Sequence, residues 1–263
     1  MTATYPVERL HVEISGPEDG EPLLLLHGWG SHSGLMHPIA EALSDTYRVY
    51  NLDLPGHGAS PPPPEPWGVP EYAALVTRFL DDHELHRVTI IGHSNGGRIA
   101  LYLAASPETG PRIRRLILIS PSGIRPRRTV SYYIRSTLAR LLKAPLRYLP
   151  PSLRERGLTW LHQTIIWEWL GSSDYRQATG VMRATFVRTV NYYFTPDVLQ
   201  RIHQPVLIFW GDQDRAISRE QVETLCSLLP DAGLVVLPGA GHYGYLDQPQ
   251  PFIAATRHFL QTK

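Results

Sequence analysis

The segment Gly92-His93-Ser94-Asn95-Gly96 constrains this chain more than any other. It follows the apolar run of residues 87–91 and precedes a helix-like stretch over residues 97–104, so it predicts a strand, a tight turn and a helix. Glycines on both sides of the serine permit a sharp, strained turn that projects the serine hydroxyl away from the backbone. This turn therefore predicts a sheet whose strands alternate with helices along the chain.

Strand-like and helix-like stretches do alternate on both sides of this turn. Strands are predicted over residues 7–14, 22–26, 47–52, 87–91, 115–119, 206–210 and 234–237, and helices over residues 35–44, 70–83, 96–105, 218–229 and 249–261. The first strand alternates apolar and polar residues like an edge or antiparallel strand, whereas the run at 22–26 is wholly apolar. The pattern predicts an α/β fold with a mostly parallel sheet and helices on both faces.

The sequence between residues 123 and 202 differs from this alternation. Its helical patterns are interrupted by proline and glycine, and it has no obvious buried strand. We expect residues 1–122 to form the first part of an α/β core, residues 123–202 a helical cap (a lid), and residues 203–263 the second part of the core. The cap is thus inserted between two late strands of the sheet.

The cap also concentrates positive charge and aromatic residues. It contains 13 basic and four acidic residues, a net charge of +9, whereas the rest of the chain carries −8. It holds 11 of the 25 aromatic residues. The arginines can form a solvated helical face, or they can attract an anionic substrate or an acidic carrier protein. Because the net charge of the whole chain is only +1, we expect no nucleic-acid partner.

The compartment is indicated by two simple features. The single cysteine, Cys226, excludes an internal disulfide and a cysteine-rich zinc site, which suits a reducing environment. No stretch approaches the ~20 apolar residues that a membrane span requires, and residues 1–10 lack the pattern of a secretion signal. These features predict a soluble, cytoplasmic protein without a membrane span.

A serine hydroxyl needs a base, and that base needs a carboxylate to orient it. Asp212 and Asp214 follow the strand predicted at residues 206–210, and His242 follows the strand at 234–237. Because catalytic groups of parallel sheets gather at the carboxyl ends of the strands, we expect Ser94, Asp214 and His242 to meet there. Asp212 is the alternative acid, and its other possible role is to bind turn amides. His93 is expected to support the site rather than to act as the base, because the side chains of neighbouring residues at such a turn diverge.

At this point the chain resembles the α/β-hydrolases over essentially its whole length. The matching residues are His27-Gly28-Trp29-Gly30, Asp53 with residues 56–60, residues 92–96, residues 211–214 and Gly241-His242. The resemblance implies that Asp214, the last residue of its turn, is the acid, and that the backbone N–H groups of Trp29 and Asn95 form an oxyanion hole. It implies no metal and no organic cofactor. It also implies that His57 is structural.

The substrate is expected to be selected by the cap. We expect Trp29, Tyr132, Trp167, Phe186 and Tyr243 to bind substrate and to favour small to medium apolar or aromatic acyl groups. The sequence His27-Gly28-Trp29-Gly30 is also similar to that of the pimeloyl-acyl-carrier-protein methyl ester esterases. That likeness implies a substrate linked to an acidic carrier protein.

These observations predict a serine carboxylic ester hydrolase. A carbon–carbon bond hydrolase of ring-cleavage products would use the same three residues, as would an acyltransferase or a cofactor-free perhydrolase. A non-enzymatic ligand receptor built on the same fold is the remaining alternative. A serine in place of an aspartate at position 94 argues against the dehalogenase and epoxide hydrolase branches.

Overall fold

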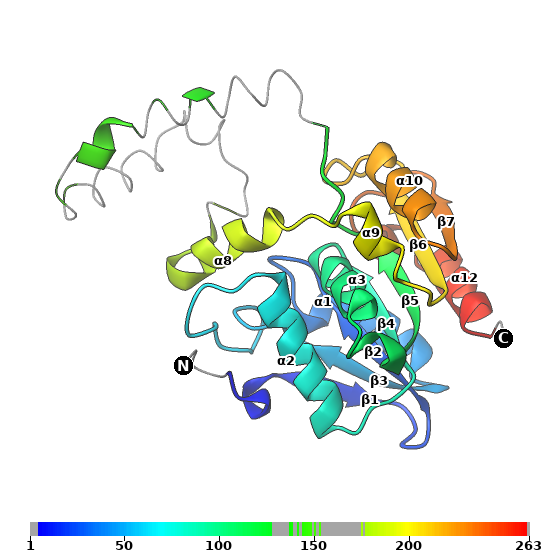
Figure 1. Cartoon of the computed structure of the whole chain (residues 1–263). Helices are drawn as coiled ribbons and strands as arrows, with labels where there is room; N and C mark the ends of the chain where they lie inside the picture. The colour runs from blue at the N-terminus through cyan, green and yellow to red at the C-terminus, as the bar shows by residue number, and fades with distance from the viewer. Residues whose placement is uncertain are drawn as a thin grey trace.

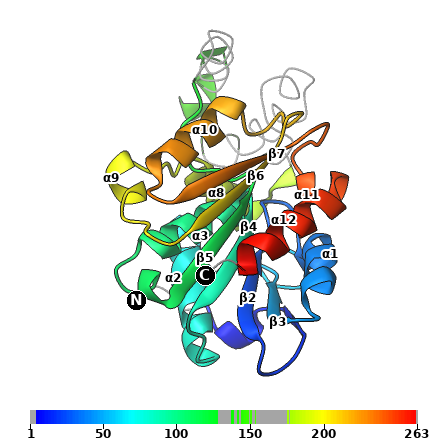
Figure 2. The ribbon, with the colours of Figure 1, turned by 90° about the vertical axis from the view of Figure 1, so that its right-hand side faces the viewer.

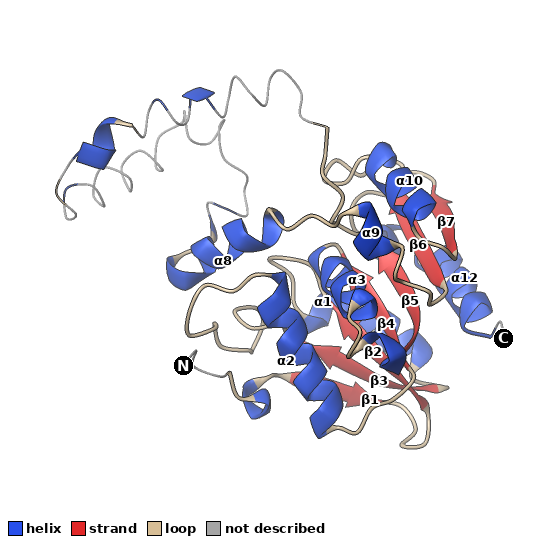
Figure 3. Ribbon diagram, viewed as in Figure 1, coloured by secondary structure: helices blue, strands red, loops and turns tan. Residues whose placement is uncertain are grey.

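The computed structural model describes residues 5–127 and 177–261, with positions 137–138, 141, 144–148, 150, 153 and 175 between them. These residues contain a seven-stranded sheet with helices on both faces (Figure 1 and Figure 3). The strand order is β1-β3-β2-β4-β5-β6-β7, in which β1 is antiparallel to its neighbour and the other pairs are parallel. The predicted α/β fold is confirmed.

The strand that precedes Ser94 lies at the centre of this sheet. The seven strands are β1 (Val12–Ser15), β2 (Glu21–Leu26), β3 (Tyr47–Leu52), β4 (Val88–His93), β5 (Ile113–Ile119), β6 (Val206–Gly211) and β7 (Ala232–Leu237). All six residues of β4 are buried, because neighbouring strands flank it and helices cover both of its faces. The carboxyl ends of β2, β4, β6 and β7 therefore meet at one edge of the sheet.

The helices form two layers that bury opposite faces of the sheet. In Figure 2, α1 (Ser33–Leu43), α11 (Gly244–Asp247) and α12 (Pro249–Gln261) lie on one side of the sheet, and α2 (Val69–Asp82), α3 (Asn95–Ala105) and α10 (Arg219–Leu228) lie on the other. The four leucines of β2 divide between the two layers. Leu23 and Leu25 pack with α1 and α12, and Leu24 and Leu26 pack with α2 and α3. This alternation explains why the whole run is apolar.

The prediction for residues 7–14 is wrong in part. Instead of one strand, the structure has a 3₁₀ turn, η1 (Val7–Arg9), followed by β1. The N–H of Leu10 closes the turn on the carbonyl of Val7, and the Leu10 side chain is buried in the core. Burial of Leu10 thus outweighs the alternating pattern. The remaining part of the prediction, an antiparallel edge strand, is confirmed by β1.

The chain leaves the core after β5 and returns before β6 at two points that lie together. The N–H of Phe194 donates to the carbonyl of Gly123 at 3.0 Å. A Cβ on Gly123 would lie 2.8 Å from the Phe194 ring, so this approach requires glycine. Between them the described elements are η3 (Pro145–Tyr148) and α8 (Gly180–Val190), and α9 (Pro196–Leu199) follows. The cap boundaries at 123 and 202 stay a prediction.

Candidate active site

Ser94 occupies a strained turn between β4 and α3. Its φ of +50° and ψ of −106° lie outside the regions that a non-glycine residue ordinarily adopts. The N–H of Ser94 donates to Ile119 at 2.9 Å, and its carbonyl accepts from the N–H and hydroxyl of Ser122 at 3.1 and 3.0 Å. A Cβ on Gly96 would lie 2.0 Å from the carbonyl oxygen of Leu26. The fold therefore fixes the backbone of Ser94 tightly, as the glycine-flanked motif predicts.

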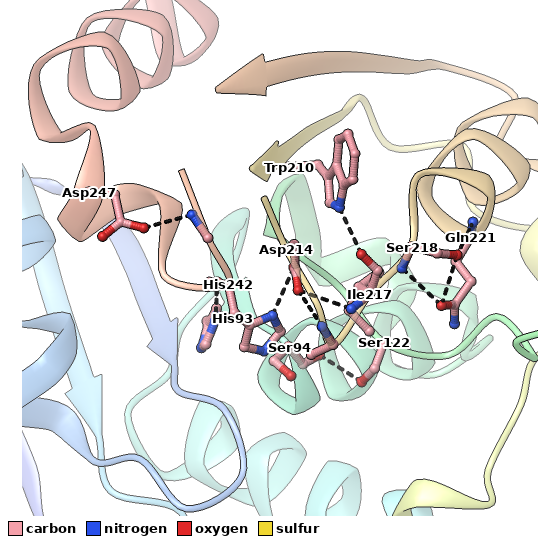
Figure 4. A network of polar contacts seen from close by, with 12 residues as sticks. His93, Ser94, Ser122, Trp210, Asp214, Ile217, Ser218, Gln221, His242 and Asp247 are labelled. Atoms are coloured by element: carbon pink, nitrogen blue, oxygen red, sulfur yellow. Dashed lines mark hydrogen bonds and ion pairs between the residues drawn. The ribbon is translucent and has the colours of Figure 1, made fainter. Parts of the chain in front are cut away.

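Asp214 and His242 meet beside this serine. The Asp214 Oδ2 accepts a hydrogen bond from His242 Nδ1 at 2.9 Å, and Oδ1 accepts from the N–H groups of Ala216 and Ile217 at 2.7 and 3.0 Å. Figure 4 shows His242 between Asp214 and Ser94, which come from three different loops. Because the carboxylate can only accept, the proton of His242 lies on Nδ1 and Nε2 is left with a lone pair.

The protonation state of Asp214 follows from its surroundings. Its side chain is fully buried, and burial alone would raise its pKa. The hydrogen bond from His242, the charge of that ring and the N–H of Ile217 outweigh burial, so the pKa of Asp214 lies below its ordinary value. The carboxylate is therefore ionised at neutral pH and can stabilise a positive charge on His242.

The alternative acid, Asp212, is held elsewhere. Its Oδ1 accepts from the N–H of Gly239 at 2.8 Å and from the side chain of Gln213 at 3.2 Å. The bond from Gly239 fastens the turn after β6 to the turn after β7, which is the amide-binding role expected for Asp212. The structure brings Asp214 rather than Asp212 to His242.

The two predicted oxyanion donors belong to backbone segments that adjoin the serine. Asn95 is the first residue of α3, where backbone N–H groups have no partner within the helix. Trp29 follows Gly28, and a Cβ on Gly28 would lie 3.2 Å from the Cβ of Ser94. The loop that carries the Trp29 N–H therefore passes directly against the serine. That the two N–H groups bind a negatively charged oxygen at Ser94 stays a prediction.

His27 ties this loop to the neighbouring one. Its Nδ1 donates to the carbonyl of Gly28 at 2.7 Å, and its Nε2 accepts from the N–H of Leu54 at 2.9 Å. Burial lowers the pKa of His27 to about 3, so the ring is neutral. The sequence motif marks His27, but its residues do not show which loop it binds. That bond depends on β2 and β3 lying side by side.

A cavity of about 230 Å³ opens next to the Trp29 loop. Its walls come from the loops after β2 and β3 and from the start of α8, and they are formed by Trp29, Gly30, Gly56, His57, Gln177, Ala178, Thr179 and Met182. The Trp29 ring lies 4.8 Å from the ring of His57 and 5.2 Å from that of Phe186. His57, which the resemblance implied to be structural, therefore also lines this cavity.

The residues expected to bind substrate fall into three groups. Trp29 lines the cavity, and Phe186 packs on Trp29 from α8. Tyr243 lies away from that cavity, with its ring 5.7 Å from His242 and 4.7 Å from His93. Tyr132 and Trp167 lie outside the described residues.

Described basic residues between positions 123 and 202 make contacts within the chain. Arg125 lies over the Tyr193 ring at 5.2 Å, and Arg183 over the Tyr175 ring at 5.5 Å. Arg127 pairs with Glu220 at 2.6 Å, although its side chain is 87% exposed. Such a solvated ion pair contributes little to stability and leaves the guanidinium accessible.

Among the described residues, no three His, Cys, Asp or Glu side chains are grouped so that they could hold a metal ion. None of the helices found there has the length and apolar character that spanning a membrane would need.

Comparison with known proteins agrees with this geometry. The family described as alpha/beta hydrolase fold matches residues 21–249. A pimeloyl-[acyl-carrier protein] methyl ester esterase from Nitrosomonas europaea is 27% identical over 93% of this chain and 97% of its own length. A hydrolase from Pseudomonas aeruginosa PA01 has 25% identity and a TM-score of 0.71, covering 96% of this chain and 94% of its own. A carboxylesterase from Bacillus subtilis shares the fold, with 23% identity, a TM-score of 0.69 and coverages of 96% and 87%. The chain therefore belongs to the alpha/beta hydrolase fold family and is a hydrolase.

Proposed function

We propose that this hydrolase cleaves carboxylic esters with Ser94 as nucleophile, His242 as base and Asp214 as the orienting acid. The observation that carries the proposal is the 2.9 Å bond between Asp214 and His242 beside a strained Ser94. That bond leaves His242 Nε2 as the proton acceptor, which is the state that a serine nucleophile needs.

The reaction follows from these positions. Ser94 Oγ attacks the ester carbonyl carbon while His242 Nε2 takes its proton, and the carbonyl oxygen becomes an oxyanion that the Trp29 and Asn95 N–H groups bind. The intermediate collapses and the alcohol leaves with the proton from His242. Water, deprotonated by His242, then attacks the acyl carbon; the carboxylic acid leaves and Ser94 regains its proton. No cofactor is needed for these steps.

We infer that the cavity beside Trp29, whose walls include neither Ser94 nor His242, receives small to medium apolar or aromatic acyl groups of a substrate bound at Ser94. A cavity of ~150 Å³ is sufficient for benzene, so about 230 Å³ accommodates a ring or a short chain with several further atoms. The rings of Trp29 and His57 supply aromatic contact surface on two of its walls.

A second substrate class is an acyl group carried by an acidic protein. The name of the Nitrosomonas europaea relative and the exposed Arg127 favour it. Charge reversal at Arg125, Arg127 and Arg128 would then weaken the dependence of kcat/KM on ionic strength for a carrier-linked methyl ester. An unchanged salt dependence would remove the carrier from the proposal and leave the ester chemistry standing.

The chemistry is tested with p-nitrophenyl esters of graded acyl length. The native protein is expected to cleave short to medium esters, and Ser94→Ala to lower kcat by at least about 10⁴-fold. Ser106→Ala, at the other end of α3, is the matched control and should retain activity. If no ester is cleaved by the native protein, or if Ser94→Ala retains activity, the proposed function is wrong.

We also propose that the enzyme works in the cytoplasm. Cys226 is the single cysteine, and burial raises the pKa of its thiol, which disfavours the reactive thiolate. Activity confined to the soluble cytoplasmic fraction of the source cells is expected; activity in an extracellular fraction would contradict it.

A further inference from the structure

His93 fills the space behind His242. It is the last residue of β4, only 1% of it is exposed, and it comes directly before Ser94 in the chain. Its ring centre lies 4.7 Å from that of His242, 4.7 Å from that of Tyr243 and 5.6 Å from that of Tyr245. The side chain thus points away from the direction of the Ser94 hydroxyl and toward the loop that carries His242.

The hydrogen bond of His93 fixes which ring nitrogen carries the proton. Its Nε2 lies 3.0 Å from the carbonyl oxygen of His242, and a carbonyl can only accept. Nε2 is therefore the donor and Nδ1 carries the lone pair. Burial lowers the pKa of His93 to about 3, so the ring keeps this neutral form across the working range of a serine hydrolase. His93 consequently cannot replace His242 as the base.

The other nitrogen of the His93 ring, Nδ1, lies against the loop that carries Gly28 and Trp29. Nδ1 of His93 is buried and makes no hydrogen bond within the described residues. It faces Gly28, where a Cβ would lie 2.8 Å from this nitrogen. One neutral ring therefore separates the backbone of His242 from the loop that presents the Trp29 N–H. The two nitrogens of the ring thus contact the segments that carry the base and an expected oxyanion donor.

The bonds of the His242 loop show what His93 adds. Gln213 N–H donates to Ala240 at 2.9 Å, and Gly241 N–H donates to the Asp247 carboxylate at 2.8 Å, so the loop is held up to position 241. At position 242 the ring is held by Asp214, and the main-chain carbonyl by His93. Asp214 alone permits the ring to pivot about one hydrogen bond. The bond to His93 adds a second point of attachment, at the main chain of the same residue.

We propose that His93 is a positioning residue that holds the main chain of His242, so that Nε2 of His242 faces Ser94 at the correct distance from the oxyanion hole. This inference rests on the proposed ester hydrolysis. Its energetic reason is that a displacement of ~1 Å between reacting groups can cost ~100-fold in rate.

The test compares two amides of different length. In His93→Gln, the amide nitrogen reaches the position of Nε2 and can donate to the His242 carbonyl; in His93→Asn, it reaches only the position of Nδ1. Kinetics are measured on the best p-nitrophenyl ester. We expect His93→Asn to lower kcat by about 30–100-fold with KM changed less than about threefold. His93→Gln should recover most of the loss.

A second readout separates this inference from the proposed function and from general destabilisation. The proton on His242 Nδ1 gives a low-field NMR signal that reports its bond to Asp214 and needs no turnover. We expect this signal to broaden or shift in His93→Asn and to return in His93→Gln. Equal kcat values and equal spectra for the two amides would overturn the positioning role, even if Ser94→Ala confirms the esterase. A kcat loss that only follows a lowered Tm in both variants would overturn it as well.

Discussion

Asp53 and Asp214 each lie just after a strand, and they differ in how many of their carboxylate oxygens bind backbone N–H groups. Asp53 follows β3, and its two oxygens accept from the N–H groups of Ser33 at 2.6 Å and Ala59 at 2.8 Å. Asp214 follows β6, and a single oxygen, Oδ1, accepts the hydrogen bonds from the N–H groups of both Ala216 and Ile217. Its second oxygen is left for His242.

Under the proposed mechanism, this difference separates a loop that shapes the site from a loop that takes part in the chemistry. Asp53 uses both oxygens on the backbone, and residues 56 and 57 of its loop form a wall of the cavity beside Trp29. Asp214 also binds two backbone N–H groups, but it does so with one oxygen, and its other oxygen binds His242. The same residue type after a strand therefore has two roles, which its hydrogen bonds distinguish and its position in the sequence does not.

The largest expected effect comes from Asp214→Asn. The amide keeps the size of the side chain but can present an N–H to His242, which favours the wrong tautomer. We expect kcat for p-nitrophenyl esters to fall by about 10³–10⁴-fold, with a small change in Tm. A loss of less than tenfold would show that the free oxygen is not what distinguishes the two loops.

Asp53→Asn should have the opposite profile. The amide keeps one acceptor oxygen, so one of the two backbone N–H groups, of Ser33 or Ala59, is left without a partner in a buried site. We expect the free energy of unfolding to fall by about 1–3 kcal/mol, measured by urea denaturation. The loss of kcat should be much smaller than that for Asp214→Asn. A larger kcat loss in Asp53→Asn would contradict the division of roles.

Acid should lower the free energy of unfolding through His27, whose ring binds the loop next to Asp53. Because burial lowers the pKa of His27 from 6.5 to about 3, the unfolded chain binds a proton below pH 6.5 that the folded chain excludes. This contribution to stability is complete above pH 6.5 and is progressively lost as the pH falls toward 3.

The non-titrating variant His27→Gln tests this linkage. We expect the slope of unfolding free energy against pH, measured between pH 4 and 6, to decrease by about 1.4 kcal/mol per pH unit relative to the native protein. An unchanged slope would show that His27 is not the group whose protonation is excluded.

The smallest effect is expected at the cavity beside the Asp53 loop. Ala178→Leu adds three carbons, one methine and two methyl groups, to a wall of that cavity and leaves Asp214 and His242 untouched. We expect KM for the longest accepted p-nitrophenyl ester to rise about three- to tenfold, with kcat for the acetate unchanged. Equal changes for short and long esters would place the acyl group elsewhere.

The sequence predicts the core well because each local signal there agrees with its tertiary environment. The predicted helix at 70–83 is α2 (Val69–Asp82), and the run before Ser94 is β4, since apolar periodicity is directly the consequence of burial. Residues 7–14 were the exception, where one buried side chain, Leu10, decided the conformation.

Pairwise contacts between loops are less accessible to such reasoning. The resemblance to α/β-hydrolases favours Asp214 over Asp212, but only the register of β6 beside β7 determines which carboxylate faces His242. In the same way, the hydrogen bond from His93 to the carbonyl of His242 joins residues that lie 149 positions apart in the sequence. No local pattern at position 93 reports that partner.

The hydrogen bond between Gly123 and Phe194 has an evolutionary consequence. It joins the residues on either side of the 70-residue segment 124–193, so this segment begins and ends at the same place on the core. Doubling the length of a flexible loop costs only ~0.6 kcal/mol in closure entropy. Segments of other lengths and compositions can therefore be exchanged at this junction while β5, β6 and the residues at their ends remain in register. Evolution can therefore change the inserted segment, and with it the substrate range, without altering the residues at the ends of the core strands.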